Sequence, residues 1–328
     1  MNVWAGRSAP GIRLRPPCLP ASHWQGTRGR TLTPCGTLLS ATRPLTTDTA
    51  ATPESVSRGT RVQWTQPQAR LSLLTLNRPE RANALGTQLV HELREHLTAI
   101  RDLASTQPIG CAVLIVASNH PRVFCAGADL KERAEQSTEA QRESTARLRD
   151  TFAQLAKMPC VTIAAMNGAA MGGGLELALA CDLRVATADA TLALPETGLG
   201  ILPGAGGTQR LPRLIGVARA KEMILLGKQV RGDEALSMGL VHRAVPSMDS
   251  TENAALAEAM HLAEALLKRS PMALRLAKEA IDCGMDAGAM ANALEVENAF
   301  YSETFESADR QEGLRAFTER REPRFAGR

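Results

Sequence analysis

Aromatic side chains are scarce in this 328-residue chain, where they make up 3% of the residues and include a single tyrosine, Tyr301. Proteins that bind single-stranded nucleic acid stack the bases on aromatic side chains, so this scarcity argues against that class. Long apolar runs are also missing, since none approaches the roughly 20 residues of a membrane-spanning helix. We therefore expect neither a transmembrane segment nor a membrane partner.

Closely paired cysteines are absent too. None of the seven cysteines forms a C-x-x-C pair, and the six histidines do not cluster with cysteines or acidic residues. Beyond the N-terminal segment, the cysteines are odd in number, widely spaced and set among apolar neighbours. This pattern argues for reduced, mostly buried thiols rather than disulfides or a zinc site, and we expect no bound metal.

The first 47 residues contain no acidic residue and no lysine, but they hold six arginines. Such a segment, rich in Ser, Thr, Pro and Gly and without a compact apolar run, is typical of mitochondrial transit peptides. A disordered basic tail is the alternative. Without these arginines the formal net charge changes from +4 to −2, so the remaining chain has no basic excess to attract nucleic acid. We expect residues 1–50 to be a transit peptide with a flexible lead-in, and the protein to reside in the mitochondrial matrix.

The pattern of the remaining chain predicts an α/β fold. Strand-like runs occur at 71–76, 111–117, 160–165 and 183–186. Helical stripes with the i, i+4, i+7 spacing lie between them, at Leu93, Leu97 and Ile100 and at Leu148, Phe152 and Leu155. Such alternation is typical of βαβ units with parallel pairing.

From about residue 250 the strand signals vanish, and helical stretches follow at 254–268, 272–283 and 289–305. We therefore expect a body over residues 60–250 and a helical region over 251–328. Because the body can bury a core of its own, we expect the helical region to pack on the body or on a neighbouring subunit.

Two glutamates twenty residues apart are candidates for an acid and a base. Glu176 closes the glycine run 172–174, and Glu196 opens the stretch that ends in a second glycine cluster. Glycines let backbone N–H groups approach a ligand, and a helix beginning there directs several donors at an oxyanion. The structural alternatives are a helix-stabilising acid for Glu176, a solvated loop acid for Glu196 and a flexible loop for the glycines. The arrangement indicates a site that polarises a thioester carbonyl.

Five segments carry a family likeness. They are residues 76–85, 124–130, 172–176, 194–196 and 203–209. Through these segments the chain resembles the enoyl-CoA hydratase/isomerase, or crotonase, family from about residue 65 to the C-terminus. Within that family, residues 128–133 resemble the branch that contains mitochondrial methylglutaconyl-CoA hydratase and the enoyl-CoA hydratase domain-containing proteins. The resemblance implies a crotonase-type spiral of ββα turns, closed by a C-terminal helical trimerisation region whose trimers commonly pair into hexamers.

The resemblance also implies roles for particular residues. The N–H groups of Ala128 and Gly173 would form an oxyanion hole for the thioester carbonyl. Glu176 would activate a water and Glu196 would protonate the substrate, although the two share protons. The N–H of Gly204 would hold the attacking water. The glycines near Gly204 lack the G-x-G-x-x-G pattern and its strand context, so NAD binding is excluded.

The coenzyme A part of the substrate is expected against the loop before the first helix and the loop before residue 130. These contacts would be Asn83, Ala84, Leu85, Ala126, Gly127 and Asp129. Their structural alternatives are a turn at Asn83 and a helix N-cap at Asp129. No separate cofactor is implied, because coenzyme A belongs to the substrate. Leu194 and Pro195 depart from relatives, which leaves the acyl group open.

Three functions follow from these residues. An enoyl-CoA hydratase of fatty-acid or branched-chain amino-acid (methylglutaconyl-CoA) breakdown uses both glutamates. An enoyl-CoA isomerase, or another CoA-thioester reaction of the family, keeps the oxyanion hole but needs only one carboxylate. An RNA-binding protein on the same scaffold would need a basic face, but the helical stretch 89–103 has two arginines against three acids. We expect a hydratase that binds acyl-CoA and associates as a homotrimer or hexamer.

Overall fold

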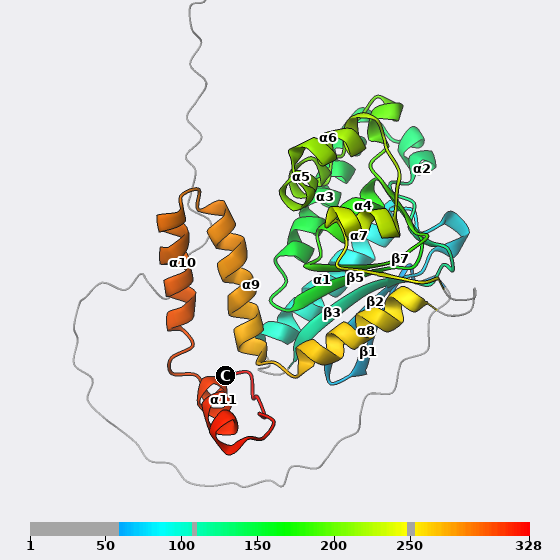
Figure 1. Ribbon diagram of the computed structural model, residues 1–328. Coiled ribbons are helices and arrows are strands. Elements are labelled where there is room, and N and C mark those ends of the chain that lie inside the picture. Colours follow the sequence, from blue (N-terminus) through cyan, green and yellow to red (C-terminus); the bar gives the residue numbers. More distant parts are fainter. Residues whose placement is uncertain (1–58, 107–109, 248–252) are drawn as a thin grey trace, which may run out of the picture.

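A computed structural model describes residues 59–106, 110–247 and 253–328, so the arginine-rich N-terminal segment lies outside the described residues. The body of the protein is built around a six-stranded sheet in the order β1–β2–β3–β5–β7–β10 (Figure 1). Its strands are β1 (Val62–Gln68), β2 (Arg70–Leu76), β3 (Cys111–Ser118), β5 (Val161–Met166), β7 (Leu183–Thr187) and β10 (Arg243–Val245). Only β1 and β2 pair antiparallel, and the other neighbours are parallel. Four of these strands, β2, β3, β5 and β7, confirm the runs expected from the sequence.

A second, smaller sheet is built from short strands in the order β4–β6–β8–β9. These are β4 (Val123–Cys125), β6 (Ala169–Met171), β8 (Thr191–Ala193) and β9 (Val230–Arg231). The chain passes from a strand of the large sheet to a strand of the small sheet and then into a helix, three times in succession. This confirms the crotonase-type spiral of ββα turns.

The helices of the body follow the strands of the spiral. They are α1 (Thr87–Thr106), α2 (Leu130–Glu135), α3 (Thr138–Ala156), α4 (Gly173–Leu179), α5 (Gly207–Ile215), α6 (Val217–Leu225) and α7 (Gly232–Met238). Both apolar stripes expected on α1 and α3 are buried, with every member at most 5% exposed. Leu114 and Val116 of β3 share one core with these helices, as alternation along a strand requires.

The opposite face of the large sheet is covered by α8 (Ala254–Leu267), which crosses the strands in Figure 1. Val113 and Ile115 of β3 pack there with Ala255 and Ala259 of the helix, and all four are fully buried. Small alanine side chains let the helix lie close to the sheet. The first helix after residue 250 is therefore part of the layered body.

Three further helices follow, α9 (Pro271–Asp286), α10 (Met290–Ser302) and α11 (Ala308–Glu319). Figure 1 shows α9 and α10 as a hairpin beside the body, with α11 and the C-terminus at its base. Ser270 caps α9, its hydroxyl accepting the Ala273 N–H at 3.1 Å and donating to Asp309 of α11 at 2.6 Å. No described helix is both long enough and apolar enough to cross a membrane.

Candidate active site

The start of α4 brings two loops into close approach. Gly172, with φ of +51°, turns the chain from β6 into α4, whose first residue is Gly173. A Cβ on Gly174 would lie 2.2 Å from the carbonyl oxygen of Cys125, and one on Gly173 would lie 3.7 Å from the Ala128 nitrogen. Glycine is needed at position 174, because any side chain would push the Cys125 strand end away.

The loop that holds Ala128 is fixed by backbone pairing with residue 85. The Leu85 N–H donates to the Gly127 carbonyl at 2.7 Å, and the Asp129 N–H donates to the Leu85 carbonyl at 3.4 Å. Within the described residues, no protein acceptor takes the N–H of Ala128 or of Gly173. Two neighbouring backbone donors without protein partners are suited to bind an oxyanion, and the role of Ala128 and Gly173 as an oxyanion hole stays a prediction.

Glu176 lies one turn into α4 and is 2% exposed. Its Oε1 accepts the N–H groups of Ala205 and Gly207, both at 2.8 Å. Burial raises the pKa of this carboxyl, while the two N–H donors and the nearby Arg210 oppose that rise. The bonded N–H groups favour the ionised form, so Glu176 is suited to accept a proton.

Glu196 follows β8 at the start of a short 3-10 helix, Glu196–Leu199, and is 8% exposed. Burial, with a contribution from the charge of Glu176, raises its pKa to about 7. Its Oε2 is buried and has no hydrogen-bond partner among the described residues. A carboxyl with these properties holds a proton near neutral pH and can donate it to a ligand.

These groups line one cavity of about 640 Å³. The cavity contains both glutamates, the Ala128 and Gly173 backbones, and also Ala126, Gly127 and Gly204. Much of the remaining wall is apolar, from Leu130, Leu148, Leu199, Ile201 and Leu202. Two carboxyls, two unpartnered N–H donors and an apolar wall can polarise a carbonyl and move protons beside it.

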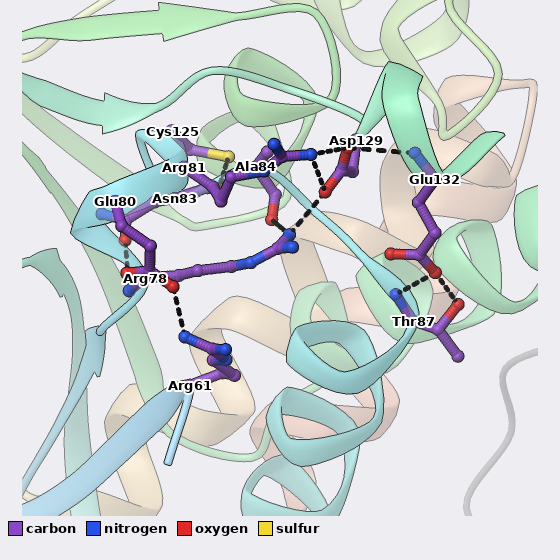
Figure 2. A network of polar contacts seen from close by, with 10 residues as sticks. All are labelled: Arg61, Arg78, Glu80, Arg81, Asn83, Ala84, Thr87, Cys125, Asp129 and Glu132. Carbon is purple, nitrogen blue, oxygen red and sulfur yellow. Dashed lines mark hydrogen bonds and ion pairs between the residues drawn. The ribbon is translucent and has the colours of Figure 1, made fainter. Parts of the chain in front are cut away.

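Four expected contacts, Asn83, Ala84, Leu85 and Asp129, do not line this cavity, and three of them, Asn83, Ala84 and Asp129, belong to the polar network of Figure 2. Asn83 is fully buried with φ of +54°, and its side-chain amide accepts the Arg78 N–H at 2.7 Å and donates to Ser118 at 2.8 Å. Its side chain thus holds the turn, the structural alternative considered for this residue. The carbonyl of Ala84 accepts from the Arg78 side chain at 2.9 Å. A coenzyme contact at Asn83, Ala84 or Leu85 stays a prediction.

Asp129 also has structural contacts within the protein. It caps α2 by accepting the Glu132 N–H at 3.2 Å and pairs with Arg78 at 2.8 Å and Arg81 at 3.0 Å (Figure 2). Burial acts to raise its pKa, but the Glu132 N–H and the two arginines outweigh this and hold the pKa below its usual range. Its role as a coenzyme contact likewise stays a prediction.

Three residues of the candidate site were not predicted from the sequence. The sequence did not indicate that the N–H groups of Ala205 and Gly207 bind Glu176, although a glycine cluster is a signal for exposed backbone donors. It also indicated no role for Arg133, which lines the cavity. No cluster of three or more potential metal ligands occurs in the described parts of the chain.

Comparison with known proteins agrees with this geometry. The family model for "Enoyl-CoA hydratase/isomerase" matches residues 66–328. The chain therefore belongs to the enoyl-CoA hydratase/isomerase family. Mouse "Enoyl-CoA hydratase domain-containing protein 2, mitochondrial" is 45% identical over 80% of this chain and 87% of its own length. Mouse "Methylglutaconyl-CoA hydratase, mitochondrial" is 42% identical over 78% and 79%.

A solved enoyl-CoA hydratase of Bacillus anthracis has the same enoyl-CoA hydratase/isomerase fold. It is 41% identical, and the match covers 82% of this chain and all of that chain with a TM-score of 0.77. Acyl-CoA substrates are typical of this family. The two sheets and the C-terminal helices of the present chain are thus those of a crotonase-family protein.

Proposed function

We propose that this protein is an enoyl-CoA hydratase, which adds water reversibly across the 2,3 double bond of an enoyl-CoA thioester. The observation that carries the proposal is the pair of buried glutamates on one cavity with unlike surroundings. Glu176 accepts two backbone N–H bonds, whereas Glu196 has a pKa of about 7 and an oxygen without a protein partner. Such a difference assigns a base and an acid.

In the proposed reaction, the Glu176 carboxylate takes a proton from water while the water oxygen bonds to C3. The π electrons move toward C2 and the thioester oxygen, where the N–H groups of Ala128 and Gly173 stabilise the negative charge. Glu196 then gives its proton to C2. Gly204 borders the cavity next to Ala205, and we propose that its N–H orients the attacking water.

An isomerase would use the same oxyanion hole but would return a proton to the substrate without adding oxygen. Retention of the second glutamate at the cavity favours hydration. The direct test is a screen of enoyl-CoA thioesters of different length and branching, in which hydration is measured as the loss of the enoyl-thioester absorbance. We expect at least one substrate to be hydrated. Double-bond migration without hydration on every substrate would refute the proposal.

We further propose that the protein works in the mitochondrial matrix. The support is the arginine-rich, acid-free N-terminal segment together with the mitochondrial names of similar proteins. N-terminal sequencing of protein from its native cells should find a chain that starts near residue 50. A cytosolic protein that begins at Met1 or Asn2 would contradict this.

The C-terminal helices are the proposed site of homotrimer formation. Ile281, Met285, Met290 and Phe317 are apolar and between 65% and 85% exposed in the single chain. Exposed apolar side chains of this size are stabilised when a partner covers them. Light scattering after size-exclusion chromatography should give a mass of three or six chains, and a monomer at micromolar concentration would refute the assembly.

A further inference from the structure

The loop that binds Glu176 is also held by two arginines. Ala205 takes part on both sides, since its N–H donates to Glu176 Oε1 at 2.8 Å and its carbonyl accepts from Nη1 of Arg210 at 2.9 Å. The preceding carbonyl, of Gly204, accepts from Nε of Arg149 at 3.0 Å. Two successive carbonyls are thus bound by cations of α5 and α3, while the Ala205 N–H between them is bound by the carboxylate.

Arg210 lies directly against this loop and is half-buried. It belongs to the first turn of α5, where its backbone N–H donates to the Gly206 carbonyl at 2.8 Å. Gly206 has φ of +113°, and a Cβ at this position would collide with Nη1 of Arg210. A Cβ on the next residue, Gly207, would lie 3.1 Å from Glu176 Oε1. The guanidinium and the carboxylate therefore meet the loop at neighbouring residues, and glycine at position 206 leaves room for the guanidinium.

The charge of Arg210 acts on Glu176 from outside the cavity, which Arg210 does not line. In the described chain Arg210 forms no ion pair with a carboxylate at contact distance. Burial raises the pKa of Glu176, and the charges of Arg210 and Arg133 act against that rise. Of the other groups nearby, Glu196 has a pKa of about 7, raised chiefly by burial, and burial raises the pKa of the Cys181 thiol to about 12, so that it is neutral.

We propose that Arg210 is a positioning residue for hydration, which holds the loop so that two N–H groups bind one oxygen of Glu176 and the carboxylate faces the water as a base. This rests on the proposed hydratase function and adds a residue to it. Both N–H bonds end on Oε1, which leaves Oε2 to meet the water. A guanidinium suits this task because it keeps its charge when partly buried, whereas a buried lysine readily loses its proton.

The experiment measures hydration of one enoyl-CoA thioester over a range of pH by wild type and three variants. Arg210→Met removes the hydrogen bond and the charge, Arg210→Gln keeps a donor without a charge, and Arg210→Lys keeps a charge. Arg210→Met should lower kcat by roughly 10-fold to 100-fold, the cost of misplacing a reacting group by about an ångström. Its KM should change little, because Arg210 does not line the cavity that would hold the substrate.

The pH profile separates this role from a merely structural one. A base that loses a nearby cation takes up its proton at a higher pH, so the acid limb of kcat/KM should move to higher pH in Arg210→Met and Arg210→Gln. Arg210→Lys should keep the acid limb of the wild type. The alkaline limb, which would report Glu196, should move less, because Arg210 contacts the loop that binds Glu176. A merely structural role would lower Tm and kcat without moving the acid limb.

Arg213→Met is the matched control, because Arg213 is an exposed arginine of the same helix whose guanidinium donates to the Gln209 carbonyl at 3.0 Å. It should leave kcat and the pH profile unchanged. The proposal is overturned if the acid limb of Arg210→Gln coincides with that of the wild type, or if Arg210→Lys moves it equally far. These two variants decide the matter if Arg210→Met does not fold. Hydration with an unmoved acid limb refutes only this inference, whereas hydration of no thioester by the wild type refutes the proposed function as well.

Discussion

Replacing Gly173 by proline tests the oxyanion hole by deleting one backbone N–H. Gly173 is the first residue of α4, a position where proline is tolerated because its N–H has no partner within the helix. Loss of one such donor typically costs about 10²-fold to 10³-fold in kcat. We expect a fall of this size for the Gly173→Pro variant, with a much smaller change in KM, since the donor acts mainly on the charge that develops in the transition state.

The structure supplies the control for this experiment. Any Cβ at position 173 would lie 2.9 Å from the Leu85 Cδ1, so alanine and proline both force the end of that flexible side chain to move. Gly173→Ala keeps the N–H and reports this steric effect alone. Steady-state hydration should be measured for both variants, with circular dichroism to establish that they fold. Equal losses of kcat in the two folded variants would refute the assignment of Gly173.

Two further predictions concern charge. Burial raises the pKa of Glu196 to about 7, so this carboxyl ionises at a higher pH in the folded protein than in the unfolded chain. The part of the free energy of unfolding that depends on its protonated form is fully present below the unfolded-state pKa and is lost as the pH rises toward 7. The Tm of the Glu196→Gln variant minus the Tm of the wild type should therefore be larger at pH 8 than at pH 5. A difference that does not change with pH would contradict the raised pKa. Asp129→Asn should lower the free energy of unfolding in urea at pH 7 by about 2 to 4 kcal/mol, because Arg78 and Arg81 lose their charged partner. The difference in the free energy of unfolding should shrink as the pH falls through the lowered pKa of Asp129. An unchanged urea midpoint at pH 7 would refute the claim that the ion pairs of Asp129 stabilise the protein.

Much of the large sheet and its helices could be predicted from hydrophobic periodicity. The strand at 111–117 and the stripe of Leu93, Leu97 and Ile100 are buried as expected, because packing on the core imposes that spacing. The strands of the small sheet contain only two or three residues each, too few to show alternation. They depend instead on contacts between successive turns of the spiral, which a single sequence does not display.

The candidate site shows a similar division. Glu176, Glu196 and the glycine run could be selected from residue type and spacing, together with a family likeness. The two N–H bonds to Glu176 could not, because they connect residues about thirty positions apart through the fold. Asn83 illustrates the opposite difficulty, since an amide that contacts a ligand and one that holds a turn look alike in sequence.

The most direct test of the two-glutamate hydratase is hydration in ¹⁸O-labelled water, with wild type, Glu176→Gln and Glu196→Gln side by side. Glutamine keeps the shape of the side chain but can neither take up nor release the proton. The wild type should place solvent oxygen in the 3-hydroxyacyl product, and each variant should lower kcat by roughly 10²-fold to 10⁴-fold. The double variant should lose less than the product of the single losses, because both groups act together in one reaction. Absence of label in the wild-type product, or full hydration activity in either single variant, would contradict the account.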